Sequence, residues 1–140
     1  MLAYLPLFAW SALAATLVPI GSEAAVVLMV RAHYSPAAIV VVATLGNYAG
    51  ACTTYWLARG ARAALVDGDE PRQQARAARV LARFGPPALL FTWVPLVGDA
   101  LVVVAGFTGV AFVPFSVWTA LGKFLRYVAV VWGALALVPS

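Results

Sequence analysis

The run from Pro36 to Leu57 contains no charged residue, and it constrains the fold more than any other stretch. As a helix rising about 1.5 Å per residue it reaches about 33 Å, enough to cross the hydrocarbon core of a bilayer once. The composition agrees, because 64% of the chain is hydrophobic and only 10% is charged, against about 25% charged residues in a soluble domain. The sequence therefore predicts an all-α integral membrane protein in which residues 1–140 form a single membrane domain.

A first interrupted apolar stretch covers residues 2–30 and is broken at residues 19–23, Pro-Ile-Gly-Ser-Glu. The arm after the break reaches only about 10 Å as a helix, too short to cross a bilayer. We therefore predict a re-entrant hairpin with Pro19 and Gly21 at its tip. The alternative is a full first span followed by a short amphipathic tail. Since no basic residue precedes Glu23, we expect the N-terminal segment to be retained rather than cleaved as a signal peptide.

A second interrupted apolar stretch covers residues 88–138 and is broken at residues 95–99, Pro-Leu-Val-Gly-Asp. Irregular backbone at membrane depth requires protein or water to satisfy it. We predict a second re-entrant hairpin with Pro95 and Gly98 at its tip, built from arms at residues 87–94 and 100–111. Residues 114–138 then form the final span.

The two interrupted stretches repeat each other at an offset of 76 residues. Pro19 corresponds to Pro95, and Glu23 corresponds to Asp99 (99 − 23 = 76). The same offset places residues 45–48, Leu-Gly-Asn-Tyr, on residues 121–124, Leu-Gly-Lys-Phe. Because a hairpin returns to its own side and one span crosses, the second unit starts on the opposite face. The sequence thus predicts two inverted repeats, residues 1–57 and 86–140.

The linker at residues 58–85 carries most of the charge. Its arginines recur at spacings of four, three and four and form one helical stripe: Arg72, Arg76, Arg79 and Arg83. This pattern predicts an amphipathic helix on a membrane surface with anionic lipid headgroups as partners. The positive-inside rule places residues 59–85 in the cytoplasm. A nucleic-acid partner is not expected for so short a segment.

Small residues within the spans indicate close helix packing. Gly46 and Gly50 form a GxxxG pattern, and Gly122 corresponds to Gly46 by the same offset. Such glycines allow two helix backbones to approach each other. We interpret them first as packing positions within the chain and second as the contact of a homodimer.

Four charged residues fall inside apolar segments: Glu23, Asp99, Lys123 and Arg126. The free-energy cost of exposing a charge to lipid indicates the direction in which these side chains point. Each charge at a helix centre costs about 2.5–3.5 kcal/mol, hence roughly 10–14 kcal/mol if all four faced lipid. We therefore expect them to face one another in a protein-lined or wet interior, with Asn47 beside them. The alternatives are a static salt-bridge cluster that fixes the hairpins and a charge-lined path for an ion or a lipid headgroup.

A family resemblance rests on these same residues. The pattern Leu-Val-Pro-x-x-x-Glu, Gly-Asn-x-x-Gly, Trp-x-Pro-x-Val-Gly-Asp and Gly-Lys-x-x-Arg-Tyr resembles the DedA family, also called the SNARE-associated or VTT-domain family, and more narrowly its short YqaA-like branch. The resemblance implies two facing re-entrant hairpins in a bacterial inner membrane. It also implies movement of lipids such as polyprenyl phosphates between leaflets and a link to proton-dependent homeostasis. By position, Glu23 matches the family's acid in the first hairpin and Pro95 the proline in the second.

One departure from the family pattern concerns the cargo. Larger members carry arginines on both sides of the second-hairpin proline, where this chain has Thr92 and Gly98. Positive charge for a phosphate headgroup would then come from Lys123 and Arg126 on the last span.

The sequence predicts a membrane transporter of a lipid or lipid phosphate, with proton coupling as one option. The alternatives are a small cation- or proton-coupled solute transporter and a structural or assembly protein. With a single histidine and no nucleophile–base pair, we expect neither an enzyme nor a cofactor or metal site.

Overall fold

The structure is a computed structural model that describes residues 3–16, 22–62 and 72–137, and every described element is helical. In chain order these elements are α1 (Tyr4–Thr16), α2 (Ser22–Arg31), α3 (Pro36–Ala61), α4 (Arg72–Phe84), the 3₁₀ helix η1 (Pro86–Trp93), α5 (Val97–Thr108) and α6 (Phe112–Leu137). The all-helical class is therefore confirmed.

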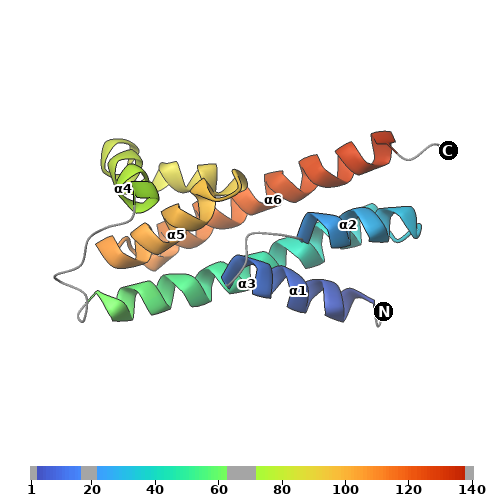
Figure 1. Ribbon diagram of the computed structural model, residues 1–140, viewed down its shortest axis with the longest axis horizontal. Helices are drawn as coiled ribbons and strands as arrows, with labels where there is room; N and C mark the ends of the chain where they lie inside the picture. Colours follow the sequence, from blue (N-terminus) through green and yellow to red (C-terminus); the bar gives the residue numbers. More distant parts are fainter. Residues whose placement is uncertain (1–2, 17–21, 63–71, 138–140) are drawn as a thin grey trace.

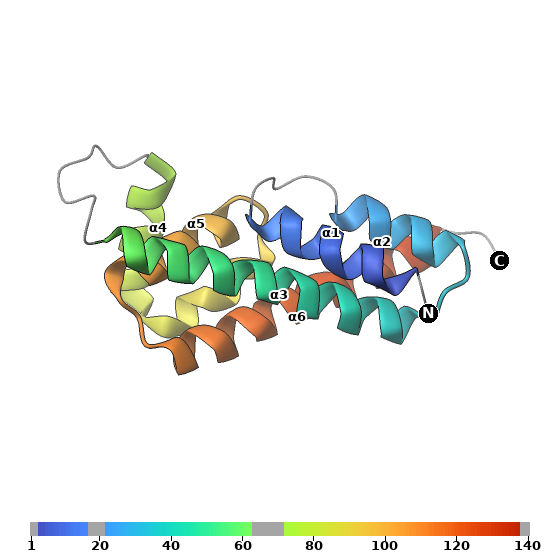
Figure 2. The same ribbon diagram turned by 90° about the horizontal axis from the view of Figure 1, so that it is seen from below.

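Two long helices, α3 and α6, form the frame of the molecule. They contact each other and run in opposite directions along its long axis (Figures 1 and 2). Each has 26 residues, hence about 39 Å in length, and each is long and apolar enough to cross a membrane. Their boundaries are 76 residues apart at both ends (112 − 36 = 76 and 137 − 61 = 76), the offset at which the sequence repeats.

The shorter helices are divided between the two ends of this frame. The pair α1 and α2 lies at one end of the long axis, and η1, α5 and α4 lie at the other (Figures 1 and 2). The first arm of each pair packs on the next long helix in the chain, α1 on α3 and η1 on α6. The second arm packs on the other long helix, α2 on α6 and α5 on α3. The two halves of the chain are therefore interlocked.

The observed boundaries differ from the expected ones at three places. The arm expected at residues 87–94 is a 3₁₀ helix that starts one residue earlier, at Pro86. Helix α5 begins at Val97 rather than residue 100, so Asp99 lies in its first turn. Helix α6 begins at Phe112, which leaves Pro114 in the first turn, where proline is tolerated.

The interior consists of two apolar clusters with a polar layer between them. One cluster includes Tyr55, Leu101 and Phe115, at the end of α4 and α5. The other includes Val26, Ile39 and Tyr127, at the end of α1 and α2. Along α3 and along α6, the buried polar residues lie between these clusters, near the middle of each long helix. The fold thus holds its buried charge at mid-length.

Candidate functional site

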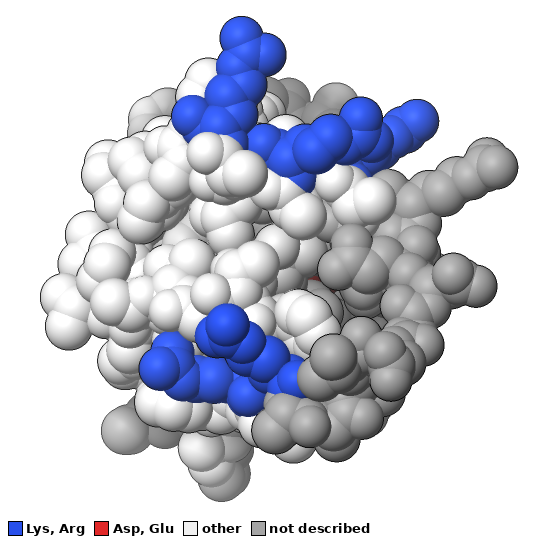
Figure 3. All heavy atoms as spheres, turned by 90° about the vertical axis from the view of Figure 1, so that its left-hand side faces the viewer, with Lys and Arg blue, Asp and Glu red and all other residues white. Residues whose placement is uncertain are grey.

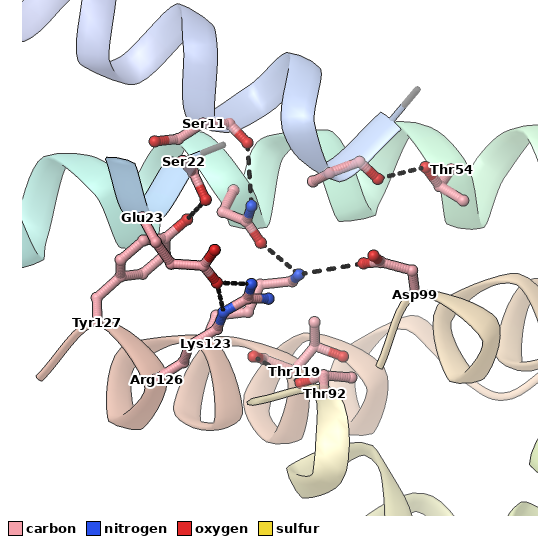
Figure 4. A network of polar contacts seen from close by, with 12 residues as sticks. Ser11, Ser22, Glu23, Thr54, Thr92, Asp99, Thr119, Lys123, Arg126 and Tyr127 are labelled. Atoms are coloured by element: carbon pink, nitrogen blue, oxygen red, sulfur yellow. Dashed lines mark hydrogen bonds and ion pairs between the residues drawn. The ribbon is translucent and has the colours of Figure 1, made fainter. Parts of the chain in front are cut away.

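Helix α6 supplies both buried cations of the polar layer. Lys123 is fully buried and Arg126 is 8% exposed, and both point away from the outer face of the helix toward α2, α3 and α5 (Figure 4). Their spacing of three residues places them on one side of an α-helix. The expected gathering of the four membrane charges is therefore present, and it forms two ion pairs.

The first pair joins Arg126 to Glu23 of α2. Arg126 Nε donates to Glu23 Oε1 at 3.1 Å, and Nη2 of the same guanidinium donates to the same oxygen. The Glu23 side chain is 38% exposed and that of Arg126 only 10%. Glu23 also lies in the first turn of α2, where the positive end of the helix favours a carboxylate. The cation of this pair is fixed inside, and its anion faces a more open space.

The second pair joins Lys123 to Asp99 at a longer distance, and the side-chain amide of Asn47 also contacts the lysine. Lys123 Nζ donates to Asn47 Oδ1 and lies 4.0 Å from Asp99 Oδ1. Asn47 in turn donates from Nδ2 to the Ser11 carbonyl at 3.0 Å, so it joins α6 to α1 through α3. Lys123 and Asn47 are 76 residues apart, so two positions that the predicted repeat makes equivalent contact each other near the middle of α3 and α6.

The tip before α5 has a strained turn. Leu96, which directly follows Pro95, has a φ of 66°, a positive value that is costly for a leucine. Gly98 comes two residues later, and a Cβ there would lie 2.5 Å from the Thr92 carbonyl oxygen. Only glycine fits this close approach, which lies at the turn where the sequence predicts a hairpin tip. Pro19 and Gly21 of the first tip lie outside the described residues.

The glycines expected to pack helices do so within the chain. A Cβ on Gly46 or Gly50 would overlap the backbone of α1, at the carbonyls of Phe8 and Ala12. A Cβ on Gly122 would lie 2.5 Å from Thr92 Oγ1 on η1. The GxxxG face of α3 is therefore occupied by α1. A homodimer stays a prediction, and α1 covers the glycine face that the sequence suggested for it.

Sequence reasoning missed the hydroxyl groups that surround the charges. Tyr127 donates to Ser22 Oγ at 3.0 Å, next to the Glu23–Arg126 pair (Figure 4). Buried side-chain oxygens of Ser11, Thr44 and Thr119 have no hydrogen-bond partner among the described residues. The available signal was a serine or threonine inside an otherwise apolar helix, Ser11 in α1 above all.

The arginine stripe is exposed at one end of the molecule. Arg76, Arg79 and Arg83 of α4 face outward, while Ala77 and Leu81 are buried; the Arg72 side chain and the acidic residues 67–70 lie outside the described part. Figure 3 shows a second basic group on the same face, separated from the first by uncharged atoms. The amphipathic character of α4 is as expected, with Phe84 on the exposed side rather than with the buried residues.

Comparison with known families matches residues 18–135 to the VTT domain. The chain belongs to the DedA family of VTT-domain proteins. It is 40% identical over 125 residues to the inner membrane protein YqaA of Escherichia coli K12, which covers 89% of this chain and 85% of the relative.

A protein of the same name from Shigella flexneri gives the same figures. An uncharacterized protein of Haemophilus influenzae is 37% identical over 94 residues. No solved structure matches. The family membership, the relatives' inner-membrane names and the two membrane-capable helices together identify a DedA-family membrane protein.

Proposed function

We propose that this DedA-family protein moves a lipid with a phosphate headgroup, such as a polyprenyl phosphate, between the leaflets of a bacterial inner membrane. The observation that carries the proposal is the pair of buried cations, Lys123 and Arg126, at mid-length of a membrane-capable helix. A fixed cation inside the membrane is costly, and it is commonly found on an ion or substrate path.

Two inverted repeats would give this site access from both sides. In support, α3 and α6 are antiparallel, their boundaries share the 76-residue offset, and each second arm packs on the other repeat's long helix. The arms α2, η1 and α5 have lengths of only about 15–18 Å, by rises of about 1.5 Å and 2.0 Å per residue, half of the hydrocarbon core. We infer that they form re-entrant hairpins, with the basic linker in the cytoplasm.

The site would bind its cargo by exchange of counter-ions. In both pairs the cation is buried and the carboxylate is about one third exposed, 38% for Glu23 and 32% for Asp99. A carboxylate that reaches open space can rotate away, and an incoming phosphate oxygen can take its place on the guanidinium, which suits phosphate well. The charge of the interior is then balanced at each stage of the passage.

The test is reconstitution of the whole chain in liposomes. We expect transbilayer movement of a fluorescent phosphate-headgroup lipid above that in empty vesicles, and faster than movement of the matching phosphatidylcholine. Movement no faster than in empty vesicles would exclude the proposal. Equal rates for both lipids would exclude selection for a net negative phosphate headgroup, because the phosphate of phosphatidylcholine is balanced by its own ammonium group.

A second candidate is a proton- or cation-coupled solute transporter, favoured by the partial exposure of both carboxylates. Here the carboxylates themselves would carry the proton, so Asp99→Asn should abolish the pH response of transport. An unchanged pH response in this variant would remove the candidate. A structural or assembly role is the third candidate, and no described contact favours it, since α1 occupies the glycine face.

A further inference from the structure

A small groove lies at the α4 end of the molecule, far from the buried charges. It encloses about 250 Å³ between α4, the start of η1 and the end of α5. The residues that line it are Ala78, Leu81, Ala82, Gly85, Pro86, Thr108 and Val110. Thr108 is the only polar side chain among them, and its hydroxyl is bonded to the Val104 carbonyl at 2.7 Å. The groove therefore has an apolar lining, and it is smaller than the roughly 300–1,000 Å³ of a small-molecule pocket.

Two guanidinium groups lie where this groove ends. Arg59 Nη1 is 3.4 Å from the Val110 carbonyl oxygen and donates to Tyr55 Oη at 2.7 Å. Arg62 reaches Gly109, the residue between the groove-lining Thr108 and Val110, since a Cβ there would lie 2.7 Å from Arg62 Nη1. Neither arginine forms an ion pair with any described residue. Two cations thus adjoin an apolar groove.

The depth of this place fits the boundary between acyl chains and headgroups. Helix α3 is about 39 Å long, longer than the roughly 30 Å hydrocarbon core, so its last turn reaches the headgroup region. Trp56, 53% exposed, lies one turn before Arg59, whose guanidinium is 5.8 Å from the indole ring. An exposed tryptophan of this kind is typical of the membrane interface.

We propose that this groove is a binding site for one anionic phospholipid, separate from the transport path. A segment of the acyl chain lies between α4 and α5, and the phosphate lies against Arg59 and Arg62. The lipid would join α4 to the bundle. The alternative role of the two arginines is to stabilise the C-terminus of α5 through its dipole, which requires no lipid.

The experiment is native mass spectrometry of the full chain with equal amounts of phosphatidylglycerol and phosphatidylcholine of identical acyl chains. We expect the protein to retain one molecule of phosphatidylglycerol in preference to phosphatidylcholine. One arginine near an anionic lipid contributes about fivefold in affinity, so Arg59→Gln/Arg62→Gln should lower the affinity for phosphatidylglycerol about twenty-five-fold. The matched control is Arg76→Gln/Arg79→Gln, which removes the same charge at the same end but away from the groove end. Equal loss in both double variants would show adsorption to a basic surface and overturn the site.

A second variant tests the groove itself. Ala82 is exposed, so Ala82→Phe fills the groove without disturbing the core, and Ala136→Phe on α6 is its control. In Ala82→Phe, the affinity for the lipid should fall about fourfold for each methylene of the acyl chain that is displaced. In Ala136→Phe, the affinity should not change. Unchanged retention in Ala82→Phe, or full displacement of the lipid by glycerol phosphate, would show that no chain occupies the groove and would overturn the proposal. The Arg126→Gln variant should retain as much phosphatidylglycerol as the wild type. Failure of the transport proposal would therefore leave the result at this groove unchanged.

Discussion

The two buried ion pairs use the same helix and the same kinds of group, yet they are built differently. Arg126 meets Glu23 directly, through two donors on one carboxylate oxygen. Lys123 is 4.0 Å from Asp99 and makes its hydrogen bond to the neutral Asn47. Arg126 is the more exposed of the two cations and makes the direct ion pair. Lys123 is fully buried and makes the longer ion pair.

This difference separates two tasks within one polar layer. An ammonium group surrounded by protein and held by an amide stays in place whatever Asp99 does. A guanidinium that depends on a single, partly exposed carboxylate changes its partner when that carboxylate moves. Under the proposed function, Lys123 would keep its partners throughout, whereas Arg126 would exchange its counter-ion for the phosphate of the cargo.

Arg126→Gln should give the largest effect. Removing one partner of a buried pair costs about 3–5 kcal/mol, and we expect about 2–3 kcal/mol because Glu23 is 38% exposed and can hydrate. The free energy of unfolding in detergent measures this. Arg31→Gln, an exposed arginine in the last turn of α2, is the control and should change stability by less than about 0.5 kcal/mol. Equal effects of the two substitutions would mean that the pair contributes no stability.

Asn47→Ala should have an intermediate effect, about 1–2 kcal/mol, because the Ser11 carbonyl and Lys123 Nζ each lose a hydrogen-bond partner in a buried place. Thr53→Ala on the same helix removes an exposed bond to Ala49 and serves as the control. A loss no larger than that of the control would show that Asp99, not Asn47, holds Lys123.

Asp99→Asn should have the smallest effect on stability, below about 1 kcal/mol, since the contact of Asp99 with Lys123 is long and the asparagine keeps a side-chain oxygen at the same place. Glu23→Gln should cost more, because it removes the charge from two hydrogen bonds to Arg126. The same unfolding measurement compares them. The reverse order would contradict the assignment of the tighter pair to Glu23.

The sequence was sufficient for the elements and the site members that depend on local patterns. The long helices were predicted from the uncharged run that ends near Leu57 and from the offset that links Asn47 to Lys123. The gathering of charges was predicted from the free-energy cost of a charge in an apolar segment. The choice of partners was not predictable, because Glu23 pairs with Arg126 across 103 residues through the interlocking of α2 with α6. A contact set by tertiary packing has no signature in the spacing of its residues.

The buried hydroxyls were not predicted for a related reason. Ser11 lies in a helix that holds none of the four charges, and Ser22 directly precedes Glu23 without a pattern that marks it as part of a site. Only the packing of α1 on α3 and of α2 on α6 brings them to the polar layer. The 3₁₀ geometry of η1 was not predicted either, since prolines at its first two positions are equally compatible with the first turn of an α-helix.

The most direct test of the central claim is transbilayer movement of a fluorescent phosphate-headgroup lipid in liposomes carrying the wild type, Arg126→Gln or Arg31→Gln. Circular dichroism on the same samples would establish that each variant is folded. We predict that the wild type and Arg31→Gln move the lipid at equal rates, while Arg126→Gln moves it no faster than empty vesicles do. A folded Arg126→Gln protein that moves the lipid at the wild-type rate would contradict the account.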